Sequence, residues 1–249
     1  MAGEGAPGIV GGEGNVCVHC GASASSLYRI FRSNAHIRLS RCEACDAVVD
    51  PYVEYDNVLH VLDLVLHRPA VYRHLLFNAP ALPSLPNLLV SPAALARLAL
   101  FLLACDVFVA TSRCASHHAV LGGTAGADVP SQRCTVVRTI PVVLAENLAF
   151  VAGVSAALLA VVWRGLRLGV GAVLDLVVRA LLVSSMAKAL VVLVMIWDYD
   201  AYFLGVFPNY LGVSLFRIVH IVVLTSNIVG LTVVAEAALG GGLHCGVPA

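Results

Sequence analysis

Four long apolar stretches follow the polar N-terminal part of this chain and limit what it can fold into. They cover approximately residues 93–110, 141–163, 171–197 and 213–235. A helix needs about 20 apolar residues to cross a bilayer core of about 30 Å, and each stretch approaches or exceeds that length. Because 59% of the residues are hydrophobic and only 12% are charged, a water-soluble globule could not bury this much apolar surface. The sequence therefore predicts an α-helical multispanning membrane protein.

The number of spans depends on the third apolar stretch, which is too long for a simple crossing. At about 1.5 Å per residue it would extend to about 40 Å, so we expect its embedded part to lie near Ala180–Trp197. Four spans are the main expectation, and three spans, with one weaker segment in the membrane interface, are the alternative. With four spans, eight basic residues fall on the side of the N-terminal segment and three on the other. This bias predicts that both ends of the chain lie in the cytosol.

Two cysteine pairs precede the apolar stretches. Cys17 and Cys20 form one C-x2-C pair, Cys42 and Cys45 form another, and 21 residues separate the two pairs. Two residues between cysteines let both thiolates turn toward one ion, and two such pairs complete a tetrahedral shell of four sulfurs. Because protein ligands fill all four positions, such an ion supports folding rather than catalysis. The spacing predicts a small zinc-ribbon-like module with one structural Zn²⁺.

Disulfide bonds are the alternative interpretation of these four cysteines. They need an oxidising compartment, whereas the N-terminal residues lack the basic and apolar regions of a signal peptide, so we expect a cytosolic module with reduced thiols. Two later cysteines, Cys114 and Cys134, share the loop between the first two spans. They either form a disulfide or remain free thiols, and the sequence leaves both open.

The remaining segments are assigned from composition and periodicity. Residues 57–78 have apolar side chains at helical spacing interrupted at Pro69, which predicts an amphipathic helix or helix pair. It lies either in the membrane interface or against the rest of the module. The expected order is a flexible leader over 1–16, the zinc-binding module over 17–78, a proline-rich linker over 79–92, the membrane domain over 93–236 and a Gly-rich tail over 237–249.

Charged residues within the spans need partners, since each costs about 2.5–3.5 kcal/mol at a span centre. Lys188 lies too far from the end of its span to reach the interface. Glu146 in the second span is the first candidate partner, and we expect the two to form an ion pair.

Charge and missing motifs exclude other classes of function. The formal net charge of +0 provides no electrostatic footprint for nucleic acid. The sequence contains no serine–histidine–aspartate order, no H-E-x-x-H motif and no phosphate-binding glycine loop, which are signatures of common enzyme classes. We therefore expect neither a nucleic-acid partner nor an enzyme.

Two further blocks accompany the cysteine pairs. One is the YVEYD block at Tyr52–Asp56, and the other is the YRHLLFN block at Tyr72–Asn78. With these blocks, the region from Cys17 to Asn78 resembles the Arv family of endoplasmic-reticulum membrane proteins. The resemblance implies a role in sterol homeostasis, with effects on intracellular sterol distribution, sphingolipid metabolism and glycosylphosphatidylinositol anchor assembly.

The resemblance and the residues together lead to a functional hypothesis. We expect the protein to support sterol transport and distribution from the endoplasmic reticulum, and a non-catalytic scaffold or flippase-like factor for glycosylphosphatidylinositol anchor synthesis is the alternative. Membrane lipids, sterol among them, and lipid-synthesis enzymes are the expected partners. We also predict an exposed surface that contacts lipid headgroups or a partner enzyme. It consists of Glu54, Asp56, Tyr72, Arg73, His74 and Asn78. The alternative is that these residues pack inside the protein.

Overall fold

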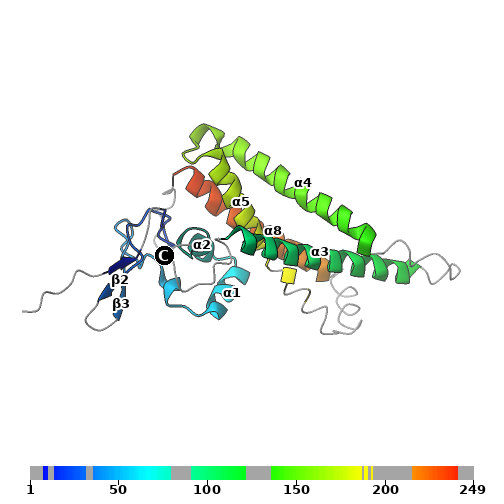
Figure 1. Ribbon diagram of the computed structural model, residues 1–249, viewed down its shortest axis with the longest axis horizontal. Coiled ribbons are helices and arrows are strands. Elements are labelled where there is room, and N and C mark those ends of the chain that lie inside the picture. Colours follow the sequence, from blue (N-terminus) through cyan, green and yellow to red (C-terminus); the bar gives the residue numbers. More distant parts are fainter. Residues whose placement is uncertain are drawn as a thin grey trace, which may run out of the picture.

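The computed structural model describes residues 8–10, 14–31, 36–79, 91–121, 136–186, 188–189, 192 and 215–240. Within these ranges, an N-terminal module of short strands, turns and short helices adjoins a bundle of longer helices (Figure 1). Three of these helices are long and apolar enough to cross a membrane. The predicted fold class, a multispanning helical membrane protein with a small cysteine-containing module, is confirmed.

The module contains a three-stranded antiparallel sheet in the order β1, β2, β3. β1 (Gly8–Val10) pairs with β2 (Tyr28–Phe31), and β2 pairs with β3 (His36–Leu39). Residues 8–10, which fall in the predicted leader over 1–16, thus form a strand of this sheet. Without them, the edge of β2 would leave unpaired backbone N–H and C=O groups. Residues 8–10 include the β-branched Ile9 and Val10, a residue type that is enriched in strands.

Short helical segments follow the second cysteine pair. They are η1 (Pro51–Val53), α1 (Asn57–Val65), α2 (Pro69–Arg73) and the π-helical turn η2 (His74–Asn78), into which α2 continues. The predicted break at Pro69 is observed. Proline occupies the first turn of α2, where its missing N–H has no intrahelical partner to lose.

In the described part of the chain, four longer helices form the bundle. They are α3 (Pro92–Leu121), α4 (Val136–Val162), α5 (Val170–Ser184) and α8 (Leu215–Ala238). α5 packs against α8, and α3 packs against α4. The short turn η5 (Trp163–Gly165) follows α4 before the chain reaches α5.

The candidate spans coincide with three of the four predicted stretches. They are Pro92–Ser112, Val136–Gly165 and Ile221–Ala238. The third predicted span, Ala180–Trp197, begins within α5, and its residues 187, 190–191 and 193–197 lie outside the described residues. The choice between three and four spans therefore stays a prediction, and so does the pairing of Cys114 with Cys134, which also falls outside the described side chains.

Lys188 has a different partner from the one predicted. Its Nζ atom lies 3.0 Å from a carboxylate oxygen of Asp106 in α3, and the Nδ2 atom of Asn147 in α4 donates to the same carboxylate at 3.2 Å. Glu146 is exposed. Neighbouring residues on a helix with 3.6 residues per turn point about 100° apart. α4 therefore presents Asn147 to this polar site and turns Glu146 outward.

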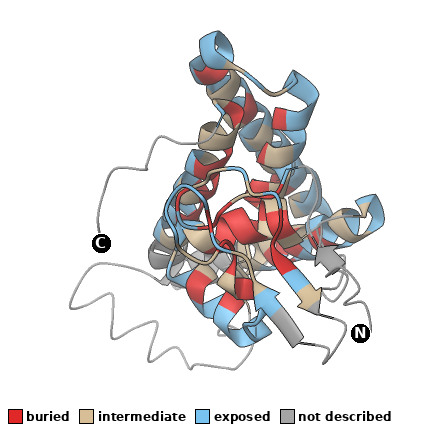
Figure 2. Cartoon of the chain, turned by 90° about the vertical axis from the view of Figure 1, so that its left-hand side faces the viewer, coloured by how far each residue is buried: buried red, intermediate tan, exposed pale blue. Residues whose placement is uncertain are grey.

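Module and bundle share one apolar core. It joins Val18 of the first cysteine pair with Tyr72 and Leu76, Val177 of α5 and Val234 of α8. Figure 2 shows the buried residues gathered in the centre of the molecule, with the outward faces of the helices exposed. The module is therefore packed against the membrane helices and is not merely tethered to them.

A second cluster surrounds the cysteines and consists of Cys17, Cys20, Leu27, Tyr28, Cys42 and Val49.

Candidate metal centre

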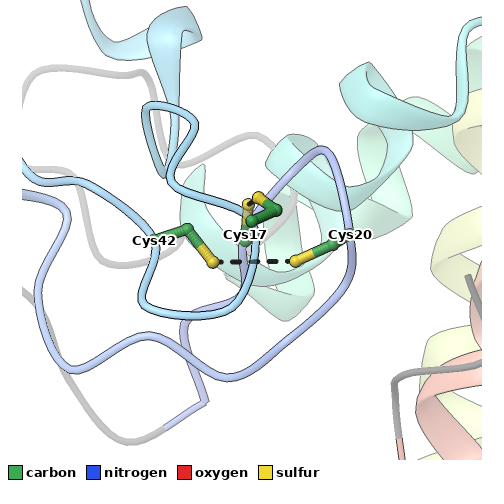
Figure 3. A group of neighbouring side chains, drawn as sticks. Cys17, Cys20 and Cys42 are labelled. Atoms are coloured by element: carbon green, nitrogen blue, oxygen red, sulfur yellow. Dashed lines mark hydrogen bonds between the residues drawn. The ribbon is translucent and has the colours of Figure 1, made fainter. Parts of the chain in front are cut away.

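The four predicted cysteines lie together, with their Sγ atoms all within 4.8 Å of one another. Cys17 Sγ is 3.7 Å from Cys45 Sγ, and Cys20 Sγ is 3.6 Å from Cys42 Sγ. Figure 3 shows the Cys20 and Cys42 side chains pointing toward each other from separate loops. A disulfide bond would need about 2.05 Å between sulfurs. All four residues are free cysteines, so the disulfide alternative is wrong.

The sulfur separations fit a tetrahedral metal ion. Four thiolates at about 2.3 Å from one ion lie about 3.8 Å from each other, which follows from the geometry of a tetrahedron. The two short separations, 3.6 and 3.7 Å, are close to that edge length. Cys17, Cys20, Cys42 and Cys45 would therefore hold one metal ion with little movement of the backbone.

The two cysteine pairs are built by the same backbone pattern. In each, the N–H of the first cysteine donates to a carbonyl five residues later, that of Ala22 or Ala47. The carbonyl of the first cysteine accepts from the N–H four residues later, that of Gly21 or Asp46. These two residues have positive φ angles of 74° and 56°, a conformation that glycine adopts freely and aspartate tolerates. The repeated turn aims both pairs of thiols at one point.

Cys17 and Cys42, the first cysteines of the two pairs, differ in their tendency to ionise. Burial raises the pKa of the Cys17 thiol. Burial also acts on the Cys42 thiol, but N–H groups of Ala44 and Cys45 donate to its sulfur and leave its pKa lowered. Metal binding must therefore release protons from this site, and the affinity for a metal falls as the pH falls.

A buried hydrogen-bond network fixes both cysteine pairs to η2. The Asn78 side chain donates to the carbonyl of Val16 and accepts from its N–H, both at 2.9 Å. Asn78 and His74 each donate to Asp50 Oδ2 at 2.7 Å, and the N–H of Tyr52 donates to Asp50 Oδ1 at 3.0 Å. Asp50, His74 and Asn78 are completely buried. Three donors compensate a carboxylate that could not otherwise be buried.

Arg73 joins the first cysteine pair to α8. One terminal nitrogen of its guanidinium donates to the carbonyls of Val18 and His19 at 2.9 and 3.1 Å. The other donates to Glu236 in the last turn of α8 at 2.8 Å. The Arg73 side chain is only 9% exposed, and hydrogen bonds to an ionised group are stronger than those between neutral groups. The residues between Cys17 and Cys20 are thus fastened to a candidate membrane span.

Tyr72 makes a second contact with α8. Its hydroxyl hydrogen-bonds the Ser226 hydroxyl, and its ring lies against Gly230, where an added Cβ would come 3.4 Å from the ring. Glycine at this position lets α2 approach the helix closely.

These contacts correct the predicted surface. Glu54 and Asp56 are exposed as expected. The other four residues are buried, so they form no surface for a headgroup or partner: they are Tyr72, Arg73, His74 and Asn78. Their polar groups bind the cysteine module and α8 in place of water. These four residues therefore pack inside the protein, as the alternative interpretation predicts. Sequence reasoning missed Asp50 and Glu236, whose partners lie far away along the chain.

The fold and the site define a helical membrane protein whose four-cysteine centre is fastened to its last described span. The chain belongs to the Arv1-like family, whose model matches residues 16–231. It is 48% identical to Protein arv1 of Schizosaccharomyces pombe over 64 residues, which cover 25% of this chain and 24% of that protein. It is 26% identical to Protein ARV1 of Homo sapiens over 246 residues, which cover 91% of this chain and 81% of that protein. No solved structure matches this chain.

Replacing Arg73 with leucine tests the attachment of the first cysteine pair to α8. We expect Arg73→Leu to lower the free energy of unfolding by about 3 kcal/mol, because two buried carbonyls lose a charged donor. Denaturant unfolding of the purified protein in detergent measures this. Arg41→Leu is the matched control, since Arg41 is 71% exposed and forms a surface pair with Asp46, and it should change stability by at most about 0.5 kcal/mol. Equal effects of the two substitutions would contradict the attachment.

Proposed function

We propose that this protein supports sterol homeostasis by maintaining sterol transport and distribution from the endoplasmic reticulum, with effects on sphingolipid metabolism. The choice of sterol as the lipid rests on the family to which the chain belongs, and on the resemblance of residues 17–78 to that family. The observation that carries the mechanism is the attachment of the cysteine module to α8 through Arg73. A module bound in this way acts as part of the membrane domain.

The proposed action is not catalytic. Four thiolates leave a tetrahedral ion no vacant position for water or substrate. The best-connected polar residues outside the cysteine centre, Asp50 and His74, are completely buried and hydrogen-bonded to each other. Both features suit a protein that binds or positions lipid, or that holds lipid-synthesis enzymes, in the membrane.

The proposed metal is one structural Zn²⁺, with the module on the cytosolic side of the membrane. Tetrahedral sulfur sites take zinc or iron, and two closely spaced cysteine pairs favour zinc. Reduced thiols agree with the cytosol, where disulfides are rare. Bound zinc cross-links the two cysteine pairs, and the residues of η2 then hold both pairs against the helices.

Elemental analysis tests the metal assignment. We expect one zinc per chain in the purified protein, and none in Cys20→Ser, because three thiolates leave the shell incomplete. Cys105→Ser is the control, since Cys105 is a buried cysteine of α3 and should leave the zinc content unchanged. Iron in place of zinc, or a folded protein without metal, would refute the assignment.

The functional proposal is tested in cells that lack the endogenous protein. We expect the wild-type chain and Arg41→Leu to restore the distribution of sterol between the endoplasmic reticulum and the plasma membrane. Arg73→Leu, expressed to the same level and still containing zinc, should fail because its module is no longer fixed to α8. Sterol distribution that is unaffected by loss of the whole protein would remove the sterol claim. Full rescue by Arg73→Leu would remove the claim that the attachment matters.

A further inference from the structure

Helix α1 has the opposite polarity from that of a water-exposed helix. Its buried residues are both polar, His60 and Asp63. Its apolar residues point outward: Val58 is 68% exposed and Leu62 is 50% exposed. A helix on the surface of a soluble domain turns its apolar stripe inward and its polar residues toward water. α1 does the reverse.

The inward polar face of α1 contacts the rest of the module. The Asp63 carboxylate accepts a hydrogen bond of 2.7 Å from the Tyr52 hydroxyl, and His60 Nδ1 donates to the carbonyl of Asp56 at 2.9 Å. The His60 ring also lies 5.0 Å from the His74 ring, measured between centroids. The Tyr52–Asp63 hydrogen bond and the ring contact with His74 set the rotation of the helix, so its apolar face cannot turn inward without breaking a buried hydrogen bond.

The outward face is a continuous apolar surface. It extends beyond both ends of the helix and consists of Tyr55, Val58, Leu59, Val61, Leu62, Val65 and Leu66, each at least 38% exposed. Exposed apolar patches of this kind mark contacts with proteins, ligands or membranes. The helix itself contains no lysine or arginine, so attraction to anionic groups does not explain the surface.

The position of α1 identifies what covers this surface. His67, two residues after α1, has its Nε2 atom 3.1 Å from the carbonyl oxygen of Val222 in α8. Val222 lies in α8, within the candidate span Ile221–Ala238. On that span, Ile221 and Leu224 are 58% and 55% exposed, as expected of side chains that face lipid. The apolar face of α1 therefore adjoins a membrane-facing surface, and Figure 1 shows α1 beside the bundle at the end that carries the module.

We infer that α1 is an interfacial membrane helix whose outward face, Tyr55 to Leu66, is buried among lipid acyl chains next to α8. Interfacial helices bury their apolar face about 5–10 Å into the boundary between headgroups and acyl chains. Since the helix has no basic residues, it enters a zwitterionic bilayer as well as an anionic one. This inference stands whether or not the protein acts on sterol.

Single-tryptophan fluorescence in the full-length protein tests the inference. The chain has two tryptophans, so Trp163→Phe and Trp197→Phe provide the background, reconstituted into phosphatidylcholine vesicles. Val58→Trp and Leu62→Trp are two independent probes of α1. Leu148→Trp on the exposed face of α4 is the lipid-facing reference, and Ser25→Trp on the exposed part of the module is the water-facing reference. Zinc content confirms that each variant keeps its module.

We expect brominated phosphatidylcholine to quench both α1 probes to within about twofold of the Leu148→Trp reference. Acrylamide in water should quench Ser25→Trp and leave the α1 probes nearly unchanged. Quenching of both α1 probes by acrylamide and not by brominated lipid would overturn the inference in favour of water. Quenching by neither would overturn it in favour of a protein cover, either a second copy of the chain or one of its segments outside the described residues.

Discussion

The structure depends on one helical segment whose polar side chains point inward. In Tyr72–Asn78, an arginine, a histidine and an asparagine are buried among apolar residues. Each finds its partners in a different part of the molecule: Arg73 in the first cysteine pair and α8, His74 at Asp50, and Asn78 at Val16 and Asp50. Buried polar groups are stable only when such bonds are made, so this segment has one correct position.

This requirement connects the cysteine centre to the membrane helices. The cysteine pairs are short loops with too small a core to fold by apolar burial alone, and a metal ion would supply the missing cross-link. Once formed, the first pair presents the carbonyls of Val18 and His19 to Arg73, and Arg73 reaches Glu236 of α8. The order of the cysteine loops and the position of α8 are therefore linked through one guanidinium group.

The sequence predicts the parts of this arrangement that local chemistry determines. The cluster of four cysteines follows from C-x2-C spacing, the membrane helices from hydropathy, and the helix break from Pro69. Directions in space are not determined locally. Periodicity shows that α1 has two unlike faces but not which face contacts protein, and it does not reveal that α4 turns Asn147, rather than Glu146, toward Asp106. Likewise, the polar residues of Tyr72–Asn78 suggest an exposed surface when only the sequence is considered. The structure shows that Asp50 and Glu236 lie against them and bury them.

Hydrogen exchange at Tyr72–Asn78 tests the central claim, that the metal centre and the membrane helices are held by one buried segment. The amides of this segment are followed by mass spectrometry in the full-length protein, before and after the metal is removed with a chelator. The account predicts at least about tenfold faster exchange after chelation, because local opening becomes easier when the cysteine loops lose their cross-link. Readdition of zinc should restore slow exchange, while peptides from α4 remain unchanged throughout. Exchange in Tyr72–Asn78 that is equally slow with and without metal would contradict the account.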